Sequence, residues 1–209
     1  MSNLIESRGC IDRTININGV GALAQGPTDP DGYGRERMYN EAVLEKMIII
    51  KDNYLDNKDY QALYDTITNT SFPWYFNPYK TYQAEQKDLE AFQFIHIFYI
   101  VDNVISSSFK ILKPILDKLK HKSLVRIKLN LNPYSQKLIV GAYHQDQDYK
   151  GKAAIYYLNT NNGYTQFKEG NEKVNSVKNR MIFFDTDAQH RNTNSTDCKN
   201  RLVLNFNYF

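Results

Sequence analysis

Apolar and polar residues alternate along several short segments of the C-terminal half, which is the pattern of half-buried β-strands. The last segment has one mainly apolar and one mainly polar face: Leu202, Leu204, Phe206 and Tyr208 against Arg201, Val203, Asn205 and Asn207. An earlier segment alternates in the same way: Val125, Ile127, Leu129 and Leu131 against Arg126, Lys128, Asn130 and Asn132. A polar face normally points to water, but it can point inward where a barrel encloses a polar ligand.

This alternation and the turns between segments predict six C-terminal strands: Leu124–Leu131, Leu138–Ala142, Ala153–Asn159, Thr165–Phe167, Met181–Asp185 and Arg201–Phe209. Upstream the pattern predicts strands, helices and an aromatic loop, in the order Met47–Ile50 (strand), Asn57–Thr68 (helix), Phe72–Tyr79 (loop), Phe92–Val101 (strand) and Ser106–Lys120 (helix). Successive strands without helices between them cannot form a parallel βαβ sheet. We therefore predict a mainly β fold of the α+β class, a double-stranded β-helix (jelly roll) with helices packed on one outer face.

Residues 1–46 differ from the rest of the chain. Glycine and proline are dense between Gly19 and Gly34, which disfavours long regular elements, and only Glu36–Lys46 has a helical pattern. We predict an N-terminal extension of unknown role over residues 1–46. Residues 47–209 form the predicted jelly-roll domain, and their length is sufficient for a substantial core.

Composition narrows the functional classes. The 209 residues include 26 Lys and Arg against 23 Asp and Glu, and the net charge of +3 is too small to indicate nucleic-acid binding. The two cysteines, Cys10 and Cys198, do not suffice for a disulfide framework or a zinc site. The N-terminus has no secretory signal, and no apolar run is long enough for a membrane span. These features predict a soluble, cytoplasmic protein, in the host cytoplasm if the chain is viral.

The candidate chemistry begins at His144-Gln145-Asp146. At a strand end, residues i and i+2 project to the same side, so one imidazole and one carboxylate can converge on a metal ion. His190 follows a later predicted strand, and Arg201 opens the last one. Two histidines and one carboxylate leave three adjacent positions open on an octahedral metal, as in non-haem Fe(II) oxygenases. A dicarboxylate that chelates this metal and reaches a guanidinium at its far end fits the spacing.

These residues belong to a longer series of landmarks: His144-x-Asp146, Ala-Ile-Tyr-Tyr-Leu-Asn at 154–159, Gly163-x-Thr165-x-Phe167, Asn179-Arg180-x-x-x-Phe184, His190 and Arg201-x-x-Leu204-Asn205. From Leu124 to the C-terminus the chain resembles the 2-oxoglutarate/Fe(II)-dependent dioxygenases. Within them it is most similar to the prolyl-4-hydroxylase-like branch, which includes small phage-encoded proteins. The resemblance implies an enzyme that hydroxylates a C–H bond, of a prolyl or another side chain in a protein or peptide, with release of succinate and CO₂.

The resemblance also implies roles for single residues. His144, Asp146 and His190 would be the catalytic metal ligands for Fe(II), and O₂ and 2-oxoglutarate would be the cosubstrates. Arg201 would bind the C5 carboxylate of 2-oxoglutarate. Tyr157 matches a tyrosine that binds this carboxylate in some relatives, and the alternative is a core tyrosine. Asn132 would contact the cosubstrate, and the alternative is a turn residue before Pro133.

Three further residues are candidates for substrate contact. Trp74 belongs to the aromatic loop, which either contacts substrate or packs over the barrel. Tyr143 and Arg191 are each adjacent in sequence to a metal-binding histidine. A protein, peptide or small-molecule substrate is favoured over nucleic acid, because nucleic-acid demethylases of this superfamily have a second arginine at the position of Asn207.

Two alternatives stay open at this stage. Asn132-Pro133-Tyr134 followed by His144-x-Asp146 is similar to the motif order of the oxidative nucleic-acid demethylases. A catalytically inactive jelly roll that serves as a binding module is the other alternative.

Overall fold

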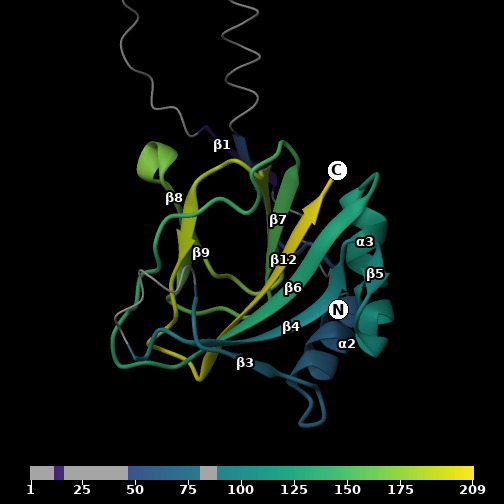
Figure 1. Ribbon diagram of the computed structural model, residues 1–209, viewed down its shortest axis with the longest axis horizontal. Coiled ribbons are helices and arrows are strands. Elements are labelled where there is room, and N and C mark those ends of the chain that lie inside the picture. Colours follow the sequence, from purple (N-terminus) through teal and green to yellow (C-terminus); the bar gives the residue numbers. More distant parts are fainter. Residues whose placement is uncertain (1–11, 17–46, 81–88) are drawn as a thin grey trace, which may run out of the picture.

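The computed structural model describes residues 12–16, 47–80 and 89–209, so the predicted helix Glu36–Lys46 lies outside the described residues. Two antiparallel sheets make up the β-structure of this part of the chain (Figure 1). The larger has nine strands: β1 (Asp12–Asn16), β2 (Met47–Lys51), β10 (Arg180–Asp185), β7 (Lys152–Tyr157), β12 (Asn200–Tyr208), β6 (Leu124–Pro133), β4 (Gln93–Ile100) and β3 (Tyr75–Asn77) in spatial order, with β5 (Asn103–Val104) beside β4. The smaller has three: β11 (His190–Asn192), β8 (Tyr164–Phe167) and β9 (Lys173–Asn175).

Three helical segments cover one face of the larger sheet: α2 (Asn57–Thr68), the 3₁₀-helix η2 (Ser107–Leu112) and α3 (Lys113–Leu119) (Figure 1). The bounds of α2 agree with the prediction. The Asp56 carboxylate caps this helix by accepting a 2.8 Å hydrogen bond from the Asp59 amide. Tyr60, Leu63 and Ile67 recur at the helical spacing and are buried against the sheet. The predicted fold class, mainly β with helices on one outer face, is therefore confirmed.

Two hydrophobic clusters lie on opposite faces of the larger sheet. The first, between sheet and helices, contains four side chains of one face of β12: Leu202, Leu204, Phe206 and Tyr208. The second lies on the other face and includes Val203, Tyr157 and Phe167, the last of them from the smaller sheet. The polar face of β12 therefore points into the interior of the jelly roll, between the two sheets. This outcome decides the alternative that the sequence pattern left open.

The predicted helix Ser106–Lys120 is interrupted. The structure has a 3₁₀-helix up to Leu112 and a short α-helix from Lys113, with a proline in its first turn. Pro114 has no amide hydrogen, so an α-helix cannot continue through it with a bond to Lys110. Beside the break, the Lys113 amide instead donates to the Lys110 carbonyl, which is the shorter 3₁₀ pattern.

The predicted strand Leu138–Ala142 was wrong. The segment forms only an isolated bridge between Val140 and Thr193. Two hydrogen bonds join Ile139 to Asn194, and one joins the Gly141 amide to the Asn192 carbonyl. Leu138 and Val140 are about 40% exposed, so the segment lies across the barrel without burying an apolar face. In the described part of the chain, no helix is long and apolar enough to cross a membrane.

Candidate active site

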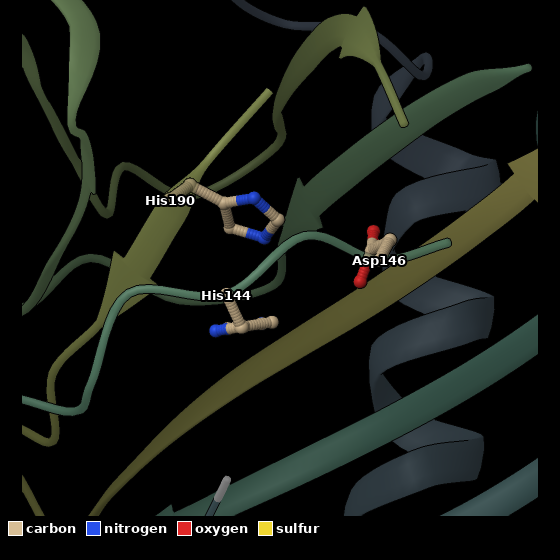
Figure 2. A group of neighbouring side chains, drawn as sticks. All are labelled: His144, Asp146 and His190. Atoms are coloured by element: carbon tan, nitrogen blue, oxygen red, sulfur yellow. The ribbon is translucent and has the colours of Figure 1, made fainter. Parts of the chain in front are cut away.

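His144, Asp146 and His190 form one group in the interior, the candidate metal-binding group. Their potential ligand atoms all lie within 4.8 Å of one another, and the two imidazole rings are 4.6 Å apart (Figure 2). His190 opens β11, whereas His144 and Asp146 belong to the irregular segment after the isolated bridge (Figure 2). Backbone hydrogen bonds of 2.9 and 2.8 Å in both directions between His144 and His190 join the two segments. The three residues that the sequence analysis predicts as metal ligands therefore lie close enough together to bind one ion.

Both histidines have the same ring nitrogen engaged. His190 Nδ1 lies 2.9 Å from the Ala188 carbonyl, and His144 Nδ1 lies 3.3 Å from the Ala142 carbonyl. A carbonyl only accepts, so Nδ1 carries the proton in each neutral ring and Nε2 keeps a lone pair for a metal ion. Burial, and then the nearby His190, lower the pKa of His144 to about 4. His144 is therefore a neutral imidazole at pH 7.

Asp146 is held by a pair of residues on two neighbouring strands. Asn207 of β12 donates a 2.9 Å hydrogen bond to Asp146 Oδ2, and Arg126 of β6 lies 3.5 Å from Oδ1. Arg126 also donates to the Asn207 side-chain oxygen at 3.2 Å, and the two residues face each other in the strand register. Burial raises the pKa of Asp146, but His190, Arg126 and Asn207 outweigh it and keep the pKa below its usual value. The carboxylate is thus anionic and oriented.

Arg201 is a buried cation at the opposite end of the same face of β12. Its side chain is 1% exposed and donates to Ser176 Oγ at 2.7 Å, to the Thr193 carbonyl at 3.2 Å and to Thr165 Oγ1 at 3.3 Å. Among the residues that the structure describes, no carboxylate pairs with this guanidinium. A buried charge without a counter-charge is costly, so the arrangement favours an anionic ligand beside Arg201.

A narrow pocket joins Arg201 to the two histidines, and asparagines from β6, β11 and β12 line it. Four of the pocket residues have a buried side-chain oxygen without a hydrogen-bond partner in the described part of the chain: Asn130, Asn132, Asn192 and Asn205. Native proteins rarely leave such atoms unpaired, so they indicate a polar ligand. Rotation of each amide exchanges its acceptor and donor ends, which lets the same side chains bind carboxylate or keto oxygens.

The two further residues that were predicted to bind the cosubstrate both lie in the interior. Asn132 is 1% exposed within β6 and lines the pocket, so it is not a turn residue. Tyr157 is fully buried with its ring 5.5 Å from the Arg201 guanidinium, and its hydroxyl donates to Thr165 Oγ1 at 2.8 Å. Tyr157 therefore makes a cation–π contact with Arg201 and shares Thr165 with it, and its contact with a cosubstrate stays a prediction.

The three predicted substrate residues lie elsewhere. Trp74 packs in the helix-side cluster against Phe72, on the sheet face away from the metal-binding group. Arg191 is paired in register with Gln166, on the opposite face of the smaller sheet from His190, and its two guanidinium hydrogen bonds go to Gln166 Oε1. Tyr143 stacks on this guanidinium at 4.3 Å. The alternation of side chains in β11 thus directs Arg191 away from the metal-binding group, and Tyr143 packs on Arg191.

Several site residues were missed from the sequence: Arg126, Asn130, Asn192, Asn205 and Asn207. A signal for four of them existed in the polar faces of β6 and β12, which the alternation displayed. The missing information was the direction in which those faces point, because a polar face is more often turned to water. Asn192 belongs to a strand too short to show any alternation.

No protein-family model and no curated protein matches the sequence. Solved structures do match. A prolyl hydroxylase from Trichoplax adhaerens, in complex with a peptide of hypoxia inducible factor, is 15% identical with a TM-score of 0.58, over 83% of this chain and 90% of that one. The viral collagen prolyl hydroxylase of Paramecium bursaria Chlorella virus-1 is 13% identical with a TM-score of 0.52, over 77% and 94%. This is the jelly-roll fold of the 2-oxoglutarate/Fe(II) oxygenases.

The same oxygenase fold supports different reactions. The α-ketoglutarate-dependent epimerase SnoN of nogalamycin biosynthesis is similar to the chain with a TM-score of 0.59 and 12% identity, over 87% of this chain and 83% of that one. The fold alone therefore does not determine the reaction, which depends on the residues of the site.

Proposed function

We propose that the protein is an Fe(II)- and 2-oxoglutarate-dependent dioxygenase that hydroxylates a C–H bond. One observation carries the proposal: the buried guanidinium of Arg201, which has no carboxylate partner among the described residues, faces the same pocket as the His144–His190 pair. The anion of a chelating diacid would neutralise Arg201 at one end and reach a metal ion at the other. When bound, Fe(II) and 2-oxoglutarate together supply the O₂-dependent oxidation, with release of succinate and CO₂.

The residues of the chain fit this group. His144 and His190 offer Nε2, because each Nδ1 is bound to a carbonyl, and Asp146 offers a carboxylate held by Asn207 and Arg126. The unpaired asparagine amides around the pocket supply polar contacts for a diacid. The larger sheet and the apolar cluster beside the pocket, which includes Phe167, keep bulk water away. The protein thus binds, orients and shields the reacting groups.

A prolyl or another side chain of a protein or peptide is the substrate that we propose. Support comes from two similar structures, whose proteins are named prolyl hydroxylases, one of them with a peptide bound. The alternative of a nucleic-acid demethylase has less support, because position 207 is an asparagine that holds Asp146.

The test is an anaerobic titration of the purified protein with Fe(II) and 2-oxoglutarate, followed by visible absorption. A weak charge-transfer band is expected in the wild-type protein. We expect His144→Ala to lose the band, and Arg201→Lys to need at least tenfold more 2-oxoglutarate, since a lysine cannot reproduce the two-pronged contact. A folded wild-type protein without the band would refute the proposal and favour a binding module.

A further inference from the structure

A lysine of β6 faces the interior of the barrel between Arg126, which contacts Asp146, and Asn130, which lines the pocket. Ile127 and Leu129 are fully buried on the helix side of β6, so Lys128 between them projects to the opposite face. In the strand register Lys128 is opposite Asn205. The neighbouring pair on the same face in one direction is Arg126 with Asn207, which holds Asp146.

The Lys128 amine has no partner in the part of the chain that the structure describes: no hydrogen bond and no ion pair is formed. Burial and then Arg126 lower the pKa of Lys128 to about 8, and Asp146, the one carboxylate that acts on it, opposes them only in part. Lys128 is partly buried, so its amine loses part of its hydration without a compensating contact. A ligand that supplies a negative charge would compensate it.

The net charge of the site is consistent with a negatively charged ligand. This step rests on the proposed function. Fe(II) with Asp146, and 2-oxoglutarate with Arg201, together carry no net charge. Arg126 and Lys128 then remain as two positive charges on the inner face of β6, and only Arg126 is in contact with a carboxylate. A substrate with an acidic group would reduce this excess.

A cavity with mixed charges lies beside Thr186, the residue whose carbonyl binds the Asp146 amide. A cavity of about 490 Å³ is lined by Lys122, Lys150, Lys152, Asp185, Asp187 and Phe209. Thr186, between the two aspartates, accepts a 3.2 Å hydrogen bond from the Asp146 amide through its carbonyl. Lys152 is paired with Asp185 at 2.5 Å, so the three lysines exceed the two aspartates by one charge only. The two aspartates disfavour a phosphodiester chain, whose negative charges are continuous.

We propose that the substrate carries a carboxylate close to the C–H bond that is oxidised, and that Lys128 binds this carboxylate. Lys128 is then a specificity-determining residue, distinct from those that bind the metal or 2-oxoglutarate. The carboxylate belongs either to an acidic residue beside the target in a peptide or to a free small acid, and the two sources are separable by experiment.

The test compares binding of a fluorescein-labelled pentapeptide, a proline flanked by two glutamates, with that of its glutamine counterpart. Fluorescence anisotropy is measured anaerobically on protein loaded with Fe(II) and 2-oxoglutarate, and free L-glutamate and a pentathymidylate are added as competitors. Lys128→Met removes the charge at similar length. Lys58→Met, at an exposed position of α2, is the matched control.

We expect the glutamate peptide to bind at least tenfold tighter than the glutamine peptide, and this preference to vanish in Lys128→Met but not in Lys58→Met. Competition by free L-glutamate at a comparable concentration would assign the carboxylate to a small acid, and otherwise to a peptide. The 2-oxoglutarate titration of Lys128→Met, read from the charge-transfer band, should match the wild type and also shows that the variant is folded.

Four results would overturn the proposal: no acidic probe binds with a preference over the amide, the preference survives in Lys128→Met, that variant binds 2-oxoglutarate more weakly, or the oligonucleotide is the tighter ligand. A wild-type protein without the charge-transfer band is a different result. It would contradict the proposed function itself, so the two failures can be told apart.

Discussion

Replacement of Asn207 by leucine tests how far the neighbours of Asp146 determine metal affinity. Asn207 is fully buried and donates one hydrogen bond to Asp146 Oδ2. Leucine has a similar volume but no amide. Arg126 loses an acceptor, yet its side chain is 25% exposed, so water can take that place. The change therefore removes chiefly the contact to the carboxylate.

The expected magnitude follows from the nature of this bond. A hydrogen bond to a charged group contributes about 1.5–3 kcal/mol, which corresponds to roughly 10- to 150-fold in affinity. Arg126 stays 3.5 Å from Oδ1 and keeps part of the orientation of Asp146. We therefore expect Asn207→Leu to weaken metal binding by about 10- to 100-fold, the range typical of residues that orient a metal ligand.

The assay is a titration with Co(II) alone at pH 7, followed by its visible absorption. The matched control is Asn205→Leu, the same exchange two residues earlier on the same face of β12, where no contact to Asp146 exists. The control should change Co(II) affinity less than about threefold. Wild-type affinity in Asn207→Leu, or an equal loss in both variants, would show that the hydrogen bond from Asn207 to Asp146 does not determine metal affinity.

Further predictions concern the pH dependence of stability, the packing around Gly163 and stabilisation by a bound metal ion. The pKa of His144 lies near 4 in the folded protein, below the value of about 6.5 for an unfolded histidine. Between these two pH values the unfolded chain binds more protons than the folded protein, so the free energy of unfolding falls as the pH decreases through this window. Urea unfolding of metal-free protein should show a loss of at most about 3 kcal/mol from pH 7 to 4, with a smaller loss in His144→Gln; an equal slope in both would contradict this. Gly163→Ala would place a Cβ 2.5 Å from the Asn194 carbonyl oxygen and 2.6 Å from Arg201 Cδ. It should cost about 1–3 kcal/mol in urea unfolding and weaken 2-oxoglutarate binding, and unchanged values for both would count against it. Saturating Co(II) should raise the melting temperature of the wild type but not of His190→Ala, because a ligand stabilises only the state that binds it; equal shifts would speak against the metal-binding group.

Much of the larger sheet could be predicted because its strands are long enough to show their period. β12 displays four full alternations, and α2 is delimited by its cap and its apolar spacing. The strands of the smaller sheet that were missed, β9 and β11, have three residues each, too few for a period of two. The segment 138–142 has strand-like composition, but its side chains remain exposed, so burial does not fix it as a strand.

The metal-binding group and Arg201 could be predicted from the sequence, whereas the asparagines that line the pocket between them could not. His144, Asp146, His190 and Arg201 belong to residue types and spacings that carry chemical information in themselves. Asparagines do not, because they are common in turns and on surfaces. The interior position of the asparagines depends on the sidedness of the larger sheet, which three helical segments decide by covering one face. Which face the helices cover depends on tertiary packing, so the sequence of a single strand does not reveal it.

β12 has a consequence for how this chain can vary. The strand is paired on both edges, with β6 and β7. Its apolar side chains face the helices, whereas Arg201, Asn205 and Asn207 face the site. Insertion or deletion of one residue would exchange these faces, sending a guanidinium into the helix-side core and leucines toward the metal. Substitutions along β12 can be compensated by neighbours, whereas a change in its length cannot. Natural or designed variants should therefore differ in the composition of this strand, while loop insertions accumulate beyond its ends.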